Sequence, residues 1–186
     1  MSSLHCVTRK EVWDLVGDRE DAGFFISGST DCTIFGADDQ SVIVWDKQTS
    51  KLFEELKGHD APVSSVRMFS GERVLTSSHD GTVKMWDVRT DSCVATVGRC
   101  QSAVLCMEYD DSTGILAAAG RDVVSHVWDI RSSKQMFKLQ GHIKWIRSMR
   151  MTGETIVIGS DDWTARVWSL NRRTCDVVIA CHAGLR

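Results

Sequence analysis

The stretch VLTSSHDGTVKMWDVR at residues 74–89 decides the fold. It starts as a run of apolar and small residues, turns at Asp80, and continues as an alternating segment that ends at Trp86 and Asp87. Alternation of β-branched and polar residues is typical of a strand with two different faces. The stretch therefore predicts two antiparallel strands joined by a tight turn.

The same pattern returns at a fixed period. A tryptophan followed by aspartate or serine recurs at spacings of 41, 42 and 40 residues; these tryptophans are Trp45, Trp86, Trp128 and Trp168. An aspartate stands six residues before each of them, at Asp39, Asp80, Asp122 and Asp162. A period of about 40 residues is that of one four-stranded propeller blade. The sequence predicts an all-β, WD-repeat β-propeller segment of about four four-stranded blades, at residues 5–57, 62–98, 103–140 and 145–181.

The predicted array is an incomplete, open propeller. Four antiparallel strands cannot bury both faces alone, so neighbouring blades must stack on one another. A broken ring leaves strand edges and tryptophan-bearing faces exposed. We therefore expect the isolated chain to associate with itself through open blade edges, to swap strands between copies, or to be unstable.

The first repeat contains an irregularity at residues 31–37. The segment GFFISGSTD ends at Asp31 with the signature of a second strand, but Ala37 stands where its tryptophan is expected. The same signature returns at Asp39, too soon for the strands that should separate two such aspartates. We favour a missing repeat between Asp31 and Ala37, and the alternative is a loop insertion within one blade.

In WD-repeat proteins, a histidine from the preceding loop and a strand hydroxyl meet the turn aspartate and the tryptophan N–H in one network. The resemblance of the repeats to those of WD-repeat proteins implies such networks in two blades. In the second blade the network would comprise His59, Asp80 and Trp86 with Thr76 or Ser78, and in the fourth His142, Asp162 and Trp168. The third blade keeps Asp122 and Trp128, but Arg99 stands where its histidine is expected. A network that has lost a member leaves a buried polar group unpaired, at about 1–3 kcal/mol.

Composition and motifs exclude several classes of function. The net charge of −3 argues against a dedicated nucleic-acid binder, which needs a clustered basic face, and no apolar run is long enough to span a membrane. The N-terminus lacks a signal-peptide hydrophobic region, so we expect a cytoplasmic chain with reduced cysteines. No C-x-x-C pair occurs, and the nearest set of metal ligands, Cys175, Cys181 and His182, lacks a second pair, so we expect neither metal nor cofactor.

An enzyme is not expected either. Ser78, His79 and Asp80 resemble a catalytic triad in composition, but adjacent strand residues point to opposite faces. The chain also lacks a phosphate loop, a dinucleotide fingerprint and a nucleophile elbow. Binding to other proteins is the function that the repeats predict.

Nearly the whole chain resembles the C-terminal WD-repeat region of plant proteins of the stomatal cytokinesis defective type, which carry an N-terminal DENN domain. The stretches that carry the resemblance include EVWDLVGDREDAGFFISGSTD, HDGTVKMWDVRTD, CVATVGRC and EYDDSTGILAAAGRD. The resemblance implies a scaffold in clathrin-related vesicle trafficking, endocytosis, cytokinesis and polarised cell expansion. Its partners would be coat-associated or Rab-regulating proteins, met in the cytoplasm or peripherally at the plasma membrane, cell plate or clathrin-coated vesicles. No DENN domain fits in this chain, so Rab exchange activity is not carried over.

Loops that share the top face of a WD propeller contain the candidate partner-binding residues. These are Trp145, Trp163, Arg121, Lys144 and His79. Exposed tryptophan and arginine are typical anchors of protein interfaces. The alternative is that Trp145 only packs against the edge of its blade.

The opposite face offers a second candidate function. Residues 74–89 fit the DWD box of substrate receptors that bind the adaptor of a cullin-4 ubiquitin ligase, with Asp87 and Arg89 as contacts. Residues 116–131 fit less well, since Ser125 replaces an aliphatic residue, but they keep Asp129 and Arg131. The alternative is that these arginines are solvated surface residues of ordinary blades.

Overall fold

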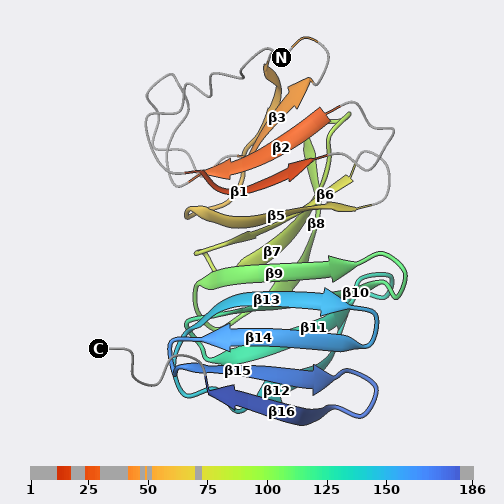
Figure 1. Cartoon of the computed structure of the whole chain (residues 1–186). Coiled ribbons are helices and arrows are strands. Elements are labelled where there is room, and N and C mark those ends of the chain that lie inside the picture. Colours follow the sequence, from red (N-terminus) through yellow and green to blue (C-terminus); the bar gives the residue numbers. More distant parts are fainter. Residues whose placement is uncertain are drawn as a thin grey trace. The chain divides into compact units, whose positions relative to one another are not determined.

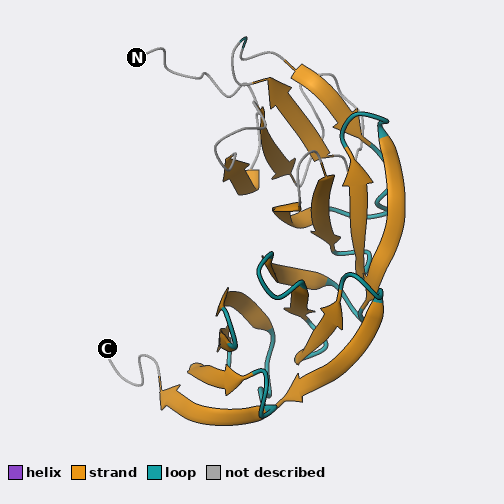
Figure 2. Cartoon of the chain, turned by 90° about the vertical axis from the view of Figure 1, so that its right-hand side faces the viewer, coloured by secondary structure: helices purple, strands orange, loops and turns teal. Residues whose placement is uncertain are grey.

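The computed structural model describes residues 12–17, 24–29, 42–46, 49, 52–69 and 73–180. These residues form sixteen strands in four antiparallel sheets and no helix, as Figure 2 shows by the orange strands and teal loops. The predicted all-β class and four-stranded blades are confirmed. Within the described ranges, no helix is long and apolar enough to cross a membrane.

Each sheet contains four consecutive strands in chain order (Figure 1). The first sheet contains β1 (Val12–Gly17), β2 (Phe24–Ser29), β3 (Val42–Asp46) and β4 (Leu52–Leu56). The second contains β5 (Val63–Phe69), β6 (Arg73–Ser78), β7 (Thr82–Asp87) and β8 (Ser92–Arg99). The third contains β9 (Val104–Asp110), β10 (Ile115–Gly120), β11 (Val124–Asp129) and β12 (Lys134–Gln140). The fourth contains β13 (Ile146–Thr152), β14 (Thr155–Ser160), β15 (Thr164–Ser169) and β16 (Thr174–Ala180).

In the first, third and fourth sheets, the repeated tryptophan is the next-to-last residue of the third strand and lies beside a register irregularity. The pairing of β11 with β12 shifts between Val127 and Trp128, and that of β15 with β16 shifts between Val167 and Trp168. A bulge bends a strand and increases its local twist. The irregularity therefore recurs at the same position of the repeat in three of the four sheets.

The chain divides into two compact units, residues 1–96 and residues 97–186. In each unit the core lies between two stacked sheets, and the first strands of those sheets, β1 with β5 and β9 with β13, lie against one another. In the second unit, buried residues of the third sheet meet Ile146, Ile156, Ile158 and Trp168 of the fourth. Stacking therefore buries the apolar faces that a single blade cannot bury.

The second strands of the second and third sheets are buried on both faces. In β10, the residues from Leu116 to Gly120 are all buried, which explains why this strand reads as an unbroken run of small and apolar residues. The fourth strands of the second, third and fourth sheets are mostly exposed, and β16 leaves Val177 and Val178 about half exposed at the edge of the fourth sheet. The tight turns at the strand ends are therefore held between buried strands, where polar groups need partners.

The first sheet contains both sides of the irregular segment. β2 pairs directly with β3, with Phe25 opposite Trp45, so the halves that the missing-repeat interpretation assigns to different repeats form one sheet. Residues 31–37 themselves lie outside the described residues. By comparison, only residues 79–81 separate β6 from β7 in the second blade.

Candidate functional site

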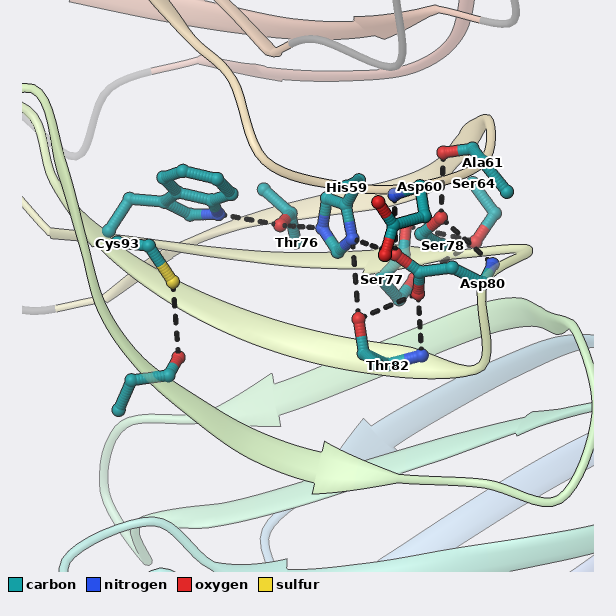
Figure 3. Close-up of polar contacts among 12 residues, drawn as sticks. His59, Asp60, Ala61, Ser64, Thr76, Ser77, Ser78, Asp80, Thr82 and Cys93 are labelled. Carbon is teal, nitrogen blue, oxygen red and sulfur yellow. Dashed lines mark hydrogen bonds and ion pairs between the residues drawn. The ribbon is translucent and has the colours of Figure 1, made fainter.

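The turn of the second blade is held by a chain of side-chain hydrogen bonds (Figure 3). The Trp86 indole N–H donates to the Thr76 hydroxyl at 2.8 Å, and Thr76 Oγ1 lies 2.7 Å from His59 Nε2. His59 Nδ1 lies 2.8 Å from the Asp80 carboxylate. The chain is complete when His59 carries its proton on Nδ1, because Thr76 then donates to Nε2 and accepts from Trp86. The structure thus brings together His59, Asp80, Trp86 and Thr76.

Asp80 is the most heavily bonded residue of this turn. Its carboxylate accepts hydrogen bonds from the backbone N–H groups of Asp60 and Thr82 and from the Thr82 hydroxyl. Burial opposes ionisation of Asp80, but the hydrogen bonds from His59, Thr82 and Asp60 outweigh it and hold the pKa of this carboxyl well below its ordinary value. Asp80 is therefore a fixed anion that organises the turn.

The triad-like sequence at residues 78–80 is not a catalytic relay. The Ser78 hydroxyl donates to the Ala61 carbonyl, and the backbone N–H of His79 donates to the Pro62 carbonyl. Asp80 faces His59 rather than His79. The geometry accounts for these residues as parts of the turn.

The fourth blade repeats only half of this network. His142 Nδ1 lies 2.7 Å from the Asp162 carboxylate, and burial is again outweighed by hydrogen bonds from Thr164 and His142, which lower the pKa of Asp162. At the register position of Thr76, however, stands Ile158, which has no hydroxyl. His142 Nε2 and Trp168 Nε1 are consequently buried without a hydrogen-bond partner among the described residues. Sequence reasoning had placed Trp168 in the network, and the structure does not bring it there.

In the third blade, Cys100 rather than Arg99 occupies the place of the histidine. The backbone N–H groups of Asp60, Gln101 and Ile143 all donate to the turn aspartate of their own blade. The residues directly before these donors are equivalent, and they are His59, Cys100 and His142. The assignment to Arg99 was wrong because one more residue separates Gly98 from the strand at Val104 than separates Gly58 from Val63.

His126, which sequence reasoning missed, contacts the turn aspartate of the third blade instead. Its Nε2 lies 2.8 Å from the Asp122 carboxylate, its Nδ1 lies 2.8 Å from Gln135 Nε2, and its ring stacks on Trp128 at 5.6 Å between centroids. His126 stands opposite Ala118, the register equivalent of Thr76. The signal in the sequence was a histidine within the strand VSHVWD, where the second and fourth blades have Lys84 and Arg166.

The top end of the second unit carries a hollow of about 390 Å³. Its lining residues are Arg121, Val123, Ile143, Lys144, Trp145 and Asp161. The guanidinium groups of Arg121 and Arg147 lie 4.7 and 5.0 Å from the centre of the Trp145 ring, and Arg147 also pairs with Asp161 at 2.9 Å. Trp145 is 40% exposed and Ile143, which sequence reasoning did not single out, is 81% exposed. Cations beside an exposed aromatic ring form a surface suited to an acidic and apolar partner.

Two turns contribute residues to the lining of this hollow, β10–β11 and β14–β15, and each holds a bulky residue in an unfavourable backbone conformation. The turn position after the aspartate has positive φ in three blades, at Gly81, Val123 and Trp163. Glycine adopts this region freely, whereas a β-branched or bulky residue there is an outlier. Trp163 is also 65% exposed, so packing of its ring into the core does not explain the choice. Such outliers cluster at functional sites.

We call Arg121, Ile143, Lys144, Trp145 and Trp163 the top patch. All five are exposed, and they come from the β10–β11 turn, the loop before β13 and the β14–β15 turn. His79, the remaining candidate, lies half-buried in the β6–β7 turn of the first unit.

At the other end of the blades, the third strands finish in hydrogen-bonded turns. Asp87 accepts a hydrogen bond from the backbone N–H of Arg89, and Asp129 accepts one from that of Arg131. That hydrogen bond, and those from Ser132, lower the pKa of Asp129. Both arginines are exposed, so each is placed to reach a partner.

Two segments of the chain match the family described as WD domain, G-beta repeat. Residues 50–87 contain β4 and the first three strands of the second sheet, and residues 133–169 contain β12 and the first three strands of the fourth sheet.

Over 218 aligned residues, the chain is 63% identical to the DENN domain and WD repeat-containing protein SCD1 of Arabidopsis thaliana. That alignment covers 99% of this chain and 18% of the relative. Because the alignment is 218 residues long and this chain has 186 residues, at least 32 positions of the alignment have no counterpart in this chain. The chain is also 28% identical to pre-mRNA-processing factor 19 of Mus musculus over 83% of its length, and 27% identical to nuclear distribution protein PAC1 of Arthroderma otae over 73%. It spans between about a fifth and a third of the length of these relatives.

The second blade has the bridging hydroxyl of Thr76, and the fourth blade has Ile158 at that position. Removing the hydroxyl from the second blade and adding one to the fourth should therefore affect stability differently. Thr76→Val leaves the Trp86 N–H and His59 Nε2 unpaired, and should lower the free energy of unfolding by about 1–3 kcal/mol. Ile158→Thr supplies the hydroxyl that His142 and Trp168 lack, so its gain offsets most of the lost apolar burial and stability should stay within about 1 kcal/mol. Urea unfolding followed by tryptophan fluorescence measures both changes.

Ile156→Thr is the matched control, because Ile156 is as deeply buried on the same strand but stands at the register position of Val74. It should cost at least about 1 kcal/mol more than Ile158→Thr, since its hydroxyl finds no such partners. Equal losses for the two isoleucine variants would contradict the predicted bridging position.

Proposed function

We propose that this chain is a non-catalytic protein-binding segment of a longer DENN-associated scaffold, and that its top patch binds an acidic and apolar segment of another protein. The identity of 63% over 99% of the chain supports the parentage. The observation that carries the binding site is Trp163, which is held at φ +67° with its ring 65% exposed, in the same unit as the exposed Trp145 ring that Arg121 contacts.

The chemistry of the partner follows from the top patch. Arg121 and Lys144 are exposed cations, while Ile143, Trp145 and Trp163 are exposed apolar groups. A partner carboxylate could approach these cations while an apolar side chain enters the hollow beside Trp145. Large aromatic and arginine side chains provide most of the binding energy at such interfaces.

The cellular role that we propose is clathrin-related trafficking, with endocytosis, cytokinesis and polarised cell expansion as its outputs. The likeness to the Arabidopsis relative supports this role. The chain would then act in the cytoplasm, peripherally at the plasma membrane, cell plate or coated vesicles, and near Rab-regulating or coat-associated proteins.

Trp163→Gly separates binding from folding. Glycine relieves the left-handed strain, as Gly81 does in the second blade, so the melting temperature should hold or rise. The same change removes the anchoring ring and should weaken binding at least about tenfold. The probe is an acidic, apolar peptide selected from a displayed random library on the wild-type chain, measured by fluorescence polarisation.

Arg173→Gly is the matched control, because Arg173 also has positive φ and is exposed, but it lies in the β15–β16 turn at the other end of the blade. It should leave peptide binding unchanged. In the full-length scaffold, Trp163→Gly should slow internalisation of a membrane-impermeant dye and Arg173→Gly should not. Selected peptides that bind both variants equally well would refute the top patch, and unaltered internalisation would refute its trafficking role.

A second candidate is a substrate receptor that binds the adaptor of a cullin-4 ubiquitin ligase. The exposed Arg89, whose backbone N–H is fixed on Asp87, favours this function. Purified adaptor should co-precipitate with the chain, and Arg89→Ala should abolish it. Arg131→Ala, in the poorer match, should reduce the yield less, and a pull-down that Arg89→Ala leaves unchanged would remove this candidate.

We also propose self-association through the edge of the fourth sheet. β16 pairs with β15 on one side, and Val177 and Val178 are about half exposed. Exposed apolar edge strands pair with other chains, and a lysine on the edge prevents this. Light scattering should show dimers or larger species that Val177→Lys reduces, whereas a monodisperse wild-type monomer would be the contrary result.

A further inference from the structure

The third blade gathers three different metal-binding side chains at its turn. Cys100 comes from the loop before β9, Asp122 from the β10–β11 turn, and His126 from β11. Their ligand atoms all lie within 4.8 Å of one another. The three residues are not neighbours in any ligand motif, which is why the cysteine spacings gave no indication of the site.

One carboxylate oxygen of this cluster lacks a hydrogen-bond partner among the described residues. The Asp122 side chain is only 8% exposed, and its Oδ2 contacts His126 Nε2 and the Gln101 backbone N–H. Its Oδ1 is buried without a hydrogen-bond partner among the described residues. In the second blade both oxygens of Asp80 accept hydrogen bonds, because Thr82 stands where the third blade has Val124. Buried carboxylate oxygens normally have a hydrogen-bond donor, a water molecule or a cation as partner, so this oxygen points to a missing one.

We propose that Cys100, Asp122 and His126 bind one Zn²⁺ ion. Thiolate, imidazole and carboxylate are the ligand types that zinc takes, and three protein ligands leave one tetrahedral position open. His126 is already oriented by Gln135, 2.8 Å from Nδ1. With the Gln135 amide turned over, Nδ1–H donates to its oxygen and Nε2 presents its lone pair to the metal.

Metal binding would also balance the charges of this cluster. Zinc displaces the proton of the Cys100 thiol, and the metal charge then neutralises the resulting thiolate and the Asp122 carboxylate together.

The proposed metal has a structural role that follows from the missing network. Cys100 cannot bridge two partners as His59 does, and Ala118 supplies no hydroxyl in place of Thr76. Zinc would tie the loop before β9 to the turn and to β11, as His59 ties the corresponding parts of the second blade. The metal thus substitutes for the hydrogen bonds that the third blade has lost.

Cobalt substitution tests the site on the 186-residue chain, reduced and stripped of metal by a chelator. Adding Co²⁺ should produce a thiolate-to-cobalt charge-transfer absorption that saturates at one equivalent and disappears when Zn²⁺ is added. Cys100→His should lose that absorption yet fold, because it restores the histidine of the second and fourth blades. His126→Asn should weaken cobalt binding at least about tenfold, since it removes one of three protein ligands.

Cys175→Ser is the matched control, since Cys175 is a free cysteine of the same unit outside the cluster. It should keep the absorption and the stoichiometry. Circular dichroism verifies that every variant is folded. The proposal is overturned if Co²⁺ gives no charge-transfer absorption, if the absorption survives Cys100→His or vanishes with Cys175→Ser, or if folded His126→Asn binds as tightly as the wild type.

Discussion

The contact between the His59 imidazole and the Asp80 carboxylate, 2.8 Å long, is the interaction on which the second blade depends. It ties the loop that enters the blade to the turn between its two central strands. The bonds continue through Thr76 to Trp86, whose ring belongs to the apolar core between the first and second sheets. Turn geometry and blade stacking are therefore coupled, and a buried anion is tolerated because every one of its bonds is made.

The three described turns show how far that coupling can be relaxed. With Thr76 the chain of bonds is complete; with Ile158 it stops at His142, and an apolar side chain fills the gap within the core of the second unit. In the third blade, Ala118 supplies neither a hydroxyl nor a large apolar side chain, and His126 of the neighbouring strand contacts Asp122 instead. Apolar burial thus maintains the blade where hydrogen bonding is incomplete, which is consistent with packing as the dominant stabilising force.

The repeating Trp–Asp pattern predicted the sheets because the period and the strand alternation are local properties of the sequence. The resemblance to WD-repeat proteins implied that His59 would meet Asp80, and the structure brings the two together. The contacts of the third blade were not predictable in this way, because one extra residue in a loop moves Cys100 into the place expected for Arg99. His126 reaches Asp122 across a turn, and the loss at Ile158 becomes visible only when strand register places it beside Trp168. Side-chain partners depend on register, and register is not set by the repeat spacing alone.

The distribution of departures from local rules argues for function at the top of the second unit. In the second blade, glycine occupies the left-handed position of the β6–β7 turn, and the turn aspartate is fully bonded. In the third and fourth blades, Val123 and Trp163 occupy that left-handed position, and neither turn network is complete. Other residues with positive φ, Asp91, Ser133 and Arg173, lie in the turns at the other end of the blades, whereas Val123 lines the hollow and Asp122 belongs to the cluster of metal-binding side chains. Trp163 combines backbone strain with a largely exposed ring, and this combination is what motivates the binding role that we propose for it.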